Sequence, residues 1–210
     1  MIRALIADDH AVVRQGLKQI LGDTPEMVVA GEATTGQEVL DKIRAETWDV
    51  VVLDISMPDR SGLDILKQLR SERPKLPVLV LSMHSEDQYA MRVLKAGASG
   101  YLRKDSAPDE LIEAIRKVVS GGRYVSSFLA EKLAFEVGTD LSRLPHETLS
   151  DREFQVLRGI AAGKSVTEIA AELYLSPKTV STYRARMLEK MNLGTNAELI
   201  HYAMQNHLID

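Results

Sequence analysis

Five side chains that suit phosphoryl chemistry lie at or just beyond the ends of apolar runs in this 210-residue sequence: Asp8, Asp9, Asp54, Ser82 and Lys104. The three carboxylates would repel one another unless a divalent cation bound them, and hard oxygen ligands suit Mg²⁺. With the cation in place, Asp54 would stay ionised as a nucleophile. Lys104 would supply a positive charge, and Ser82 a hydrogen bond, for the oxygens of an incoming phosphoryl group. Together these residue types indicate phosphoryl transfer to Asp54.

A repeat of short apolar runs and amphipathic helical patterns must bring these side chains together. The runs predict five strands, at Ala4–Ala7, Met27–Ala30, Val50–Leu53, Val78–Leu81 and Ser99–Leu102. Helical periodicity predicts one helix that ends before Gly22 and others at about residues 36–46, 62–72, 86–96 and 108–119. This alternation predicts an α/β fold, a doubly wound five-stranded parallel sheet, with the flavodoxin-like strand order 2-1-3-4-5 as one option. The carboxyl ends of parallel strands share one rim, so the five side chains should converge there.

The composition narrows the class of protein further. The sequence contains no cysteine, which excludes disulfides, thiolate metal sites and cysteine nucleophiles. No apolar run approaches the roughly 18 residues of a membrane span, and the first run is too short for a signal peptide, so we expect a cytoplasmic protein without membrane contact. The net charge of -4 conceals one basic helix, in which Lys178, Arg184, Arg186 and Lys190 oppose only Glu189.

Several residues near the strand ends also match a known motif: Asp8-Asp9, Asp54-Ile-Ser-Met-Pro, Ser82, Tyr101 and Lys104. With this motif, residues 1–120 resemble the receiver domain of bacterial response regulators. The resemblance implies that Asp54 accepts a phosphoryl group from the phosphohistidine of a sensor histidine kinase. It implies Mg²⁺ ligands at Asp9, Asp54 and the backbone carbonyl of Ser56, with Asp8 in support. It also implies that Ser82 and Tyr101 relay phosphorylation to the receiver surface.

Residues 121–147 are predicted to connect two domains. Gly121 and Gly122 should stop the fifth helix, and Phe128–Val137 reads as one more short helix. Residues 138–147 lack periodicity and carry glycine, serine and proline, as linkers do.

Residues 148–210 are predicted to form an all-α, four-helix domain. Ser150 and Ser165 each precede a glutamate by three residues, which predicts two capping boxes, and Ser176-Pro177 predicts a third helix start. The second of these helices is short and lies only a few residues from the third. This spacing is typical of a helix-turn-helix motif.

The third helix of this domain has the character of a recognition helix. Its apolar side, which should face the core, contains Val180, Tyr183, Met187, Leu188 and Met191. Base-edge contacts are expected from the amino-terminal half, at Lys178, Ser181 and Thr182. Further DNA contacts are expected at Thr179, Arg184, Arg186 and Lys190. An isolated helix of this kind would more often be an ordinary solvated face, but the capped helix before it favours DNA binding.

Three segments, Leu149–Leu157, Gly163–Ala170 and Leu175–Tyr183, resemble the LuxR-type DNA-binding domain. With the receiver, the whole chain is similar to response regulators of the NarL/FixJ type. The resemblance implies a transcription regulator rather than an enzyme, with the histidine kinase, double-stranded DNA and RNA polymerase as partners and with homodimers formed on phosphorylation or on DNA. The resemblance also implies dimer contacts from the last helix, about residues 196–205. Its candidates are Leu199, Ile200, Ala203 and Met204, of which we expect some to pack inward instead.

Two other functions fit parts of the sequence. An α/β phosphotransferase or phosphatase could use Asp54 as a turnover nucleophile, but it would lack an acid two residues later, where Ser56 stands, and would leave residues 149–210 unexplained. A DNA-binding regulator that works without phosphorylation is the second alternative. An acyl phosphate with Mg²⁺ separates the readings, since it should modify the chain and change its DNA affinity only in the first.

Overall fold

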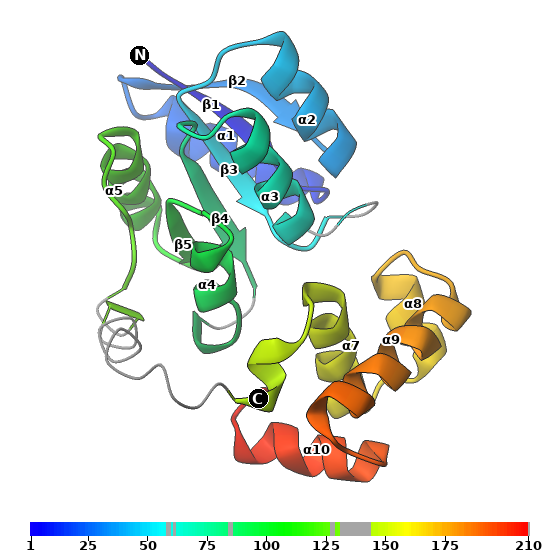
Figure 1. The fold of residues 1–210 in the computed structure, drawn as a ribbon. Coiled ribbons are helices and arrows are strands. Elements are labelled where there is room, and N and C mark those ends of the chain that lie inside the picture. The colour runs from blue at the N-terminus through cyan, green and yellow to red at the C-terminus, as the bar shows by residue number, and fades with distance from the viewer. Residues whose placement is uncertain (58–59, 61, 84–85, 127–128, 131–143, 210) are drawn as a thin grey trace. The chain divides into compact units, whose positions relative to one another are not determined.

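The computed structural model of the chain (Figure 1) describes residues 1–57, 60, 62–83, 86–126, 129–130 and 144–209. The chain divides into two compact units, residues 1–135 and 136–210, and each is described by itself. The predicted helix Phe128–Val137 and linker 138–147 lie largely outside the described residues. The predicted domain boundaries at residues 120 and 148 therefore remain predictions.

The first unit is built on a parallel sheet with the strand order β2-β1-β3-β4-β5, which confirms the flavodoxin-like prediction. The strands are β1 Ile2–Ala7, β2 Met27–Ala33, β3 Val50–Asp54, β4 Val78–Ser82 and β5 Gly100–Arg103. The helices between and after them are α1 Ala11–Gly22, α2 Gly36–Ala45, α3 Gly62–Glu72, α4 Glu86–Lys95 and α5 Pro108–Val119. Strand β3 lies between β1 and β4, and all five of its residues are buried.

Helices cover both faces of this sheet (Figure 1). On one face, Leu17 and Leu21 of α1 and Ile115 and Val118 of α5 pack against alternate strand residues such as Ile6. Helices α2, α3 and α4 lie on the other face. Because both faces are covered, the central strands are apolar along their length and become polar only where they end.

Gly62 fixes the chain that leaves β3. Its backbone N–H donates to the carbonyl of Ile55 at 3.1 Å, which brings the start of α3 back against the residues that follow the strand. A Cβ at this position would lie 2.5 Å from the Ile55 Cα and 3.0 Å from the Asp54 carbonyl oxygen. Only glycine allows this close approach of two backbones.

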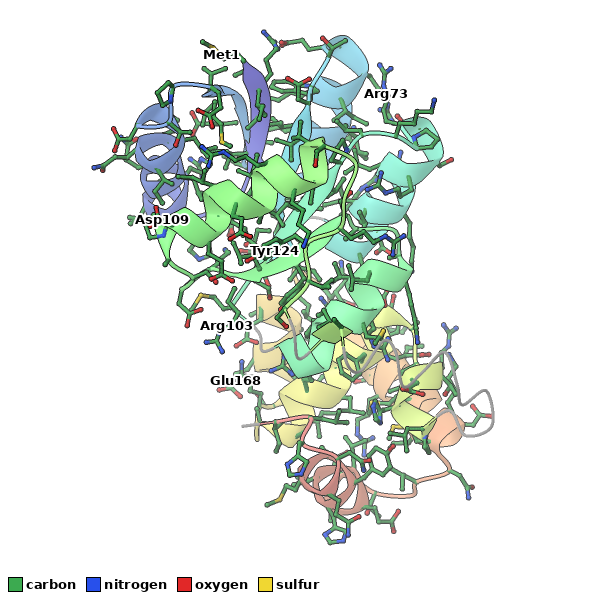
Figure 2. All side chains as sticks on the ribbon, turned by 90° about the vertical axis from the view of Figure 1, so that its left-hand side faces the viewer. Met1, Arg73, Arg103, Asp109, Tyr124 and Glu168 are labelled. Carbon is green, nitrogen blue, oxygen red and sulfur yellow. The ribbon has the colours of Figure 1, made fainter. Side chains whose placement is uncertain are left out.

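The segment after α5 covers the outer edge of β5. Tyr124 bridges Gly100 in parallel, donating its N–H to the carbonyl of Ser99 at 2.9 Å and accepting the N–H of Tyr101 at 3.3 Å. Its hydroxyl donates to Glu110 of α5 at 3.1 Å. Figure 2 labels Tyr124 where the chain leaves α5 and returns to the sheet. The residues just beyond the predicted receiver boundary therefore pack on the receiver itself.

The second unit is helical, as predicted, and contains η1 Pro145–Thr148, α7 Asp151–Ala161, α8 Val166–Glu172, α9 Pro177–Met191 and α10 Asn196–Gln205. Its helix starts are the predicted ones: Ser150 and Ser165 form capping boxes, and the hydroxyl of Ser176 caps α9. Each such cap contributes about 0.5–2 kcal/mol. Helices α8 and α9 form the helix-turn-helix. Within the described part of the chain, no helix has both the length and the apolar character that crossing a membrane would need.

Apolar residues of α9 fill the centre of this unit. Val180, Met187, Leu188 and Met191 are buried, as the helical periodicity predicted, whereas Tyr183 is only partly buried. The short 3₁₀-helix η1 packs against the same unit, because the Nδ1 of His146 lies 2.9 Å from the hydroxyl of Tyr202 in α10. The end of the predicted linker is thus attached to the helical unit.

Candidate functional sites: a phosphoacceptor centre and a nucleic-acid interface

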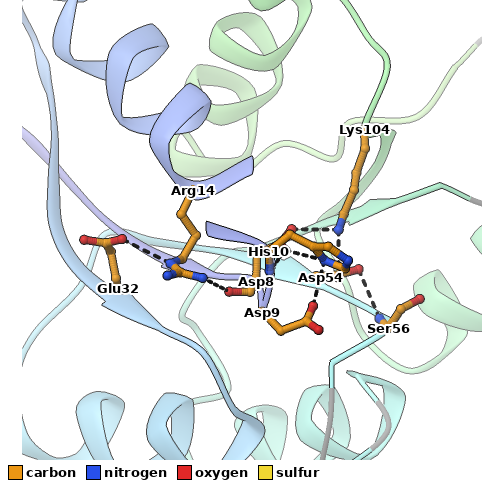
Figure 3. Close-up of polar contacts among 8 residues, drawn as sticks. All are labelled: Asp8, Asp9, His10, Arg14, Glu32, Asp54, Ser56 and Lys104. Carbon is orange, nitrogen blue, oxygen red and sulfur yellow. Dashed lines mark hydrogen bonds and ion pairs between the residues drawn. The ribbon is translucent and has the colours of Figure 1, made fainter. Parts of the chain in front are cut away.

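Asp54 ends β3 at the carboxyl rim of the sheet (Figure 3). Its side chain is 1% exposed. One carboxylate oxygen, Oδ1, accepts the backbone N–H of Ser56 at 3.0 Å, and the other, Oδ2, lies 2.7 Å from the Nζ of Lys104. The turn after the strand and the loop after β5 therefore both hold the Asp54 carboxylate in place.

Strand β1 brings a second carboxylate to the same lysine. The Nζ of Lys104 lies 2.7 Å from the Oδ2 of Asp8, which is buried beside Asp54. Asp9 follows, with a side chain that is 23% exposed. The structure thus brings together four of the five residues from which phosphoryl chemistry was predicted.

Burial dominates the electrostatics of this cluster. It raises the pKa of the Asp54 carboxyl above its ordinary value, and the attraction of Lys104 offsets this only in part. Burial alone would lower the pKa of Lys104, but Asp54 and Asp8 outweigh it, so the pKa of the ammonium lies above its ordinary value. Lys104 is therefore charged at neutral pH, and it neutralises only part of the acidic cluster.

The cluster has the chemistry of a divalent-cation site. Asp8, Asp9, His10 and Asp54 each present one ligand atom, and all four atoms lie within 4.8 Å of one another. Two buried oxygens, Asp8 Oδ2 and Asp9 Oδ1, accept no hydrogen bond of good geometry from the described residues, although Lys104 and His10 lie within ion-pair distance. A hard cation such as Mg²⁺ would satisfy these oxygens.

Ser82 and Tyr101 lie close behind this rim. Ser82 ends β4 and is buried, and its carbonyl accepts the backbone N–H of Lys104 at 2.9 Å. Tyr101 lies in β5 opposite Val80 in the parallel register, with its side chain fully buried. The relay role of both residues remains a prediction.

Three polar residues around the cluster were not predicted from the sequence. The Nδ1 of His10 lies 2.9 Å from Asp9 Oδ1 and 3.2 Å from Asp8 Oδ1. Arg14 of α1 donates to the backbone carbonyl of Asp8 at 2.8 Å and pairs with Glu32 of β2 at 3.2 Å (Figure 3). The position of His10 directly after two aspartates was the available signal. The spacing between the histidines of the sequence does not indicate this contact of His10.

The candidate DNA-reading face of α9 is largely open to solvent. Lys178, Ser181, Thr182 and Arg186 are exposed. Lys178, Thr182 and Arg186 lie opposite the buried apolar side of the helix, and Ser181 lies beside it. The hydroxyls of Ser181 and Thr182 donate to the carbonyls one turn earlier, at 2.9 and 3.0 Å. Each hydroxyl oxygen keeps lone pairs that can accept a hydrogen bond from a base.

The other predicted DNA contacts already have partners inside the domain. Arg184 donates to the side-chain oxygen of Asn196 at 2.7 Å, and the Thr179 hydroxyl lies 2.8 Å from that of Ser176 at the start of the helix. Lys190, a predicted DNA contact, forms an ion pair with the Oε2 of Glu153 at 2.7 Å. The sequence does not reveal this pair, because the capping box with Ser150 already accounts for a glutamate at position 153.

Helix α10 presents only part of its predicted dimer stripe. Leu199 and Ala203 are fully buried within the unit, so they serve its own core. Met204 is 61% exposed and Ile200 is partly exposed. The dimerisation prediction is thereby narrowed to Ile200 and Met204.

The parallel sheet with its acidic rim, followed by a helix-turn-helix unit, defines a response regulator with a DNA-binding output domain. Residues 4–116 match the family model described as response regulator receiver domain, and residues 147–203 match that of the bacterial regulatory proteins of the luxR family. The chain belongs to the response regulators with a LuxR-type DNA-binding domain. It is a DNA-binding transcription regulator, and the phosphotransferase or phosphatase alternative is not supported.

Relatives of the same organisation match along the whole chain. The chain is 39% identical to the response regulator UvrY of Escherichia coli K12, over 99% of this chain and 96% of the relative. It is 36% identical to the response regulator GacA of Pseudomonas aeruginosa, over 100% and 99%. A solved structure of RcsB from Salmonella enterica, bound to the promoter P1flhDC with the phosphomimetic BeF3-, matches with a TM-score of 0.67 and 28% identity, over 97% and 98%.

Proposed function

We propose that this transcription regulator is controlled by phosphorylation of Asp54 by a sensor histidine kinase. The observation that carries the proposal is the position of Lys104, whose ammonium lies 2.7 Å from both Asp54 and Asp8 at the carboxyl rim of the sheet. A charged lysine beside a buried carboxylate is the arrangement that a new phosphoryl group would require. The family to which the chain belongs supports the same reading.

In the transfer step, a carboxylate oxygen of Asp54 forms a bond to phosphorus as the nitrogen–phosphorus bond of the kinase phosphohistidine breaks. Lys104 would turn from the carboxylates to an oxygen of the transferred group, and Ser82 would donate its hydroxyl to another. Asp9, Asp54 and the backbone carbonyl of Ser56 would hold Mg²⁺, with Asp8 in support. When bound, the cation neutralises the phosphoryl oxygens and the surrounding carboxylates.

The output follows from the second unit. We infer that Ser82 and Tyr101 pass the change at Asp54 to the receiver surface and so favour a homodimer bound to a paired DNA site. Helix α9 would read base edges with Lys178, Ser181 and Thr182, and Arg186 would contact phosphate. RNA polymerase is the expected next partner, and the cytoplasm is the compartment in which such a regulator meets its DNA. RcsB, a relative in fold, is seen as dimers bound to DNA.

Acetyl phosphate with Mg²⁺ tests the proposal without knowledge of the kinase. We expect the intact mass of the wild type to increase by one phosphoryl group, and that of Asp54→Ala to stay unchanged. A DNA duplex is then selected from a random library with the treated wild type. Treatment should raise the affinity of the wild type for this duplex and leave the affinity of Asp54→Ala unchanged. Phosphorylation of a different residue would contradict the assignment of Asp54. A modified protein with unchanged DNA affinity would instead support a regulator that works without phosphorylation.

A further inference from the structure

Among the described residues of the second unit, Glu153 is the one charged residue that is buried. Its side chain is 4% exposed. A buried carboxylate is costly unless it is paired and hydrogen bonded. Glu153 meets both conditions, because its Oε2 accepts the backbone N–H of Ser150 at 2.8 Å and lies 2.7 Å from the Nζ of Lys190. Burial alone would raise the pKa of Glu153, but the bonds from Lys190 and Ser150 lower it, so the carboxylate is ionised at neutral pH.

The pair joins the start of α7 to the end of α9. Ser150 and Glu153 form the capping box of α7, whereas Lys190 lies in the last turn of α9. Helix α9 also packs on this core through buried apolar residues such as Met187 and Met191, and Arg184 donates to Asn196 of α10. Apolar contact resists separation but is not directional. The ion pair therefore adds a directional contact between the recognition helix and its neighbour.

This contact lies at the opposite end of α9 from the residues that should read bases. Lys178 and Lys190 are twelve positions apart in the sequence, which corresponds to about 18 Å along a helix. A tilt of roughly 5° about the Lys190 end would move the Lys178 end by about 1.5 Å. Such a shift exceeds the tolerance of a hydrogen bond to a base edge.

We propose that Lys190 and Glu153 are positioning residues for DNA recognition, which hold α9 at the angle its base contacts require, and that Lys190 does not neutralise a DNA phosphate. The proposal rests on the DNA-binding function of the family and not on phosphorylation of Asp54. The proposal predicts an unusual effect of replacing Glu153. Removing an acidic residue normally strengthens binding to DNA by electrostatics, whereas here removal of the Glu153 charge should weaken specific binding.

The test compares Lys190→Met and Glu153→Gln in the full-length protein. The probes are a duplex selected from a random library with the wild type and a scrambled duplex of the same composition, titrated from about 50 to 200 mM salt. We expect each variant to lose roughly tenfold in affinity for the selected duplex, the value of one good base contact. Affinity for the scrambled duplex and the slope of log affinity against log salt should not change.

Two further variants make the result decisive. Arg186→Met removes an exposed cation from the same helix and should weaken both duplexes alike while reducing the salt slope by about one. Lys190→Arg keeps a charge that can pair with Glu153, so it should bind the selected duplex as the wild type does. Circular dichroism shows whether Lys190→Met folds. If it does not, Lys190→Arg and Glu153→Gln still test the proposal. The proposal is overturned if Lys190→Met behaves like Arg186→Met, if Lys190→Arg fails to restore specific binding, or if Glu153→Gln binds the selected duplex as tightly as the wild type or more tightly.

Discussion

Replacing Gly62 with alanine should displace the phosphoacceptor backbone. The added Cβ would lie 2.5 Å from the Ile55 Cα and 3.0 Å from the carbonyl oxygen of Asp54. Carbon atoms normally touch at about 3.5 Å, so the two backbones must separate by about 1 Å. Both obstacles are backbone atoms, which cannot move aside as a flexible side chain would. We expect the free energy of unfolding to fall by about 1–3 kcal/mol, the usual cost of overpacking.

The same displacement should slow phosphorylation. A misplacement of about 1 Å at a reacting group can lower a rate about a hundredfold, so we expect Gly62→Ala to react with acetyl phosphate ten to a hundred times more slowly than the wild type. Urea unfolding measures the change in stability, and intact mass against time measures the rate. Gly16→Ala is the matched control, because Gly16 lies within α1 and, apart from its chain neighbours and the backbone of its own helix, no atom lies within 4 Å of the added Cβ. This control should gain about 0.5–1 kcal/mol and keep its rate.

Two results would refute this reasoning about Gly62. Wild-type stability and rate in Gly62→Ala would mean that the loop after β3 moves aside freely and that the close approach does not constrain it. A loss of stability with an unchanged rate would mean that the position of Asp54 does not limit phosphorylation. The control has its own condition: if Gly16→Ala is also phosphorylated more slowly, the rate responds to any change in the receiver and does not report on Gly62.

Three other substitutions test separate parts of the structure. Without added Mg²⁺, Asp54→Asn should be more stable than the wild type at pH 7, because burial raises the pKa of the Asp54 carboxyl and the folded protein disfavours its charge. This difference in urea midpoint should vanish as the pH falls through the raised pKa toward about 4, the pKa of an unfolded aspartate; a less stable variant at pH 7 would contradict the sign. Thr182→Ala should change the motif selected from random DNA, since Thr182 is exposed on α9; an identical motif would remove it from the base-reading residues. Met83→Ala should shorten the half-life of the phosphorylated protein on the hypothesis that Met83, which follows Ser82 in the sequence, shields the acyl phosphate from water; an unchanged half-life would argue against shielding.

Elements that depend on local pattern were predictable from the sequence. The five strands, the serine caps of α7, α8 and α9 and the range of α10 agree with the structure within a few residues. Period-two and period-3.6 patterns and capping residues act over short distances, so they are visible in a single sequence. The convergence of Asp8, Asp54 and Lys104 followed as well, because a parallel sheet brings all strand ends to one rim.

Contacts between distant segments were not predictable in this way. Lys190 and Glu153 are 37 residues apart, and nothing in the local pattern of either indicates a partner. The same holds for Arg14, which donates to the backbone carbonyl of Asp8 and pairs with Glu32. The apolar residues of α10 could be recognised, but apolar character alone does not show which of them the domain buries. Leu199 is fully buried, whereas Met204, five positions later and about 140° further round the helix, is exposed.

The bridge between Tyr124 and Gly100 bears on where the receiver can be cut. A fragment that stopped at residue 120, after α5, would leave the backbone of β5 without its neighbour and offer an open edge to other chains. It would also uncover Gly100, against which the backbone of Tyr124 packs so closely that a Cβ at Gly100 would lie 2.8 Å from the carbonyl oxygen of Tyr124. The first compact unit therefore extends past α5, and the first residues of the connection to the DNA-binding unit cover the outer edge of its sheet.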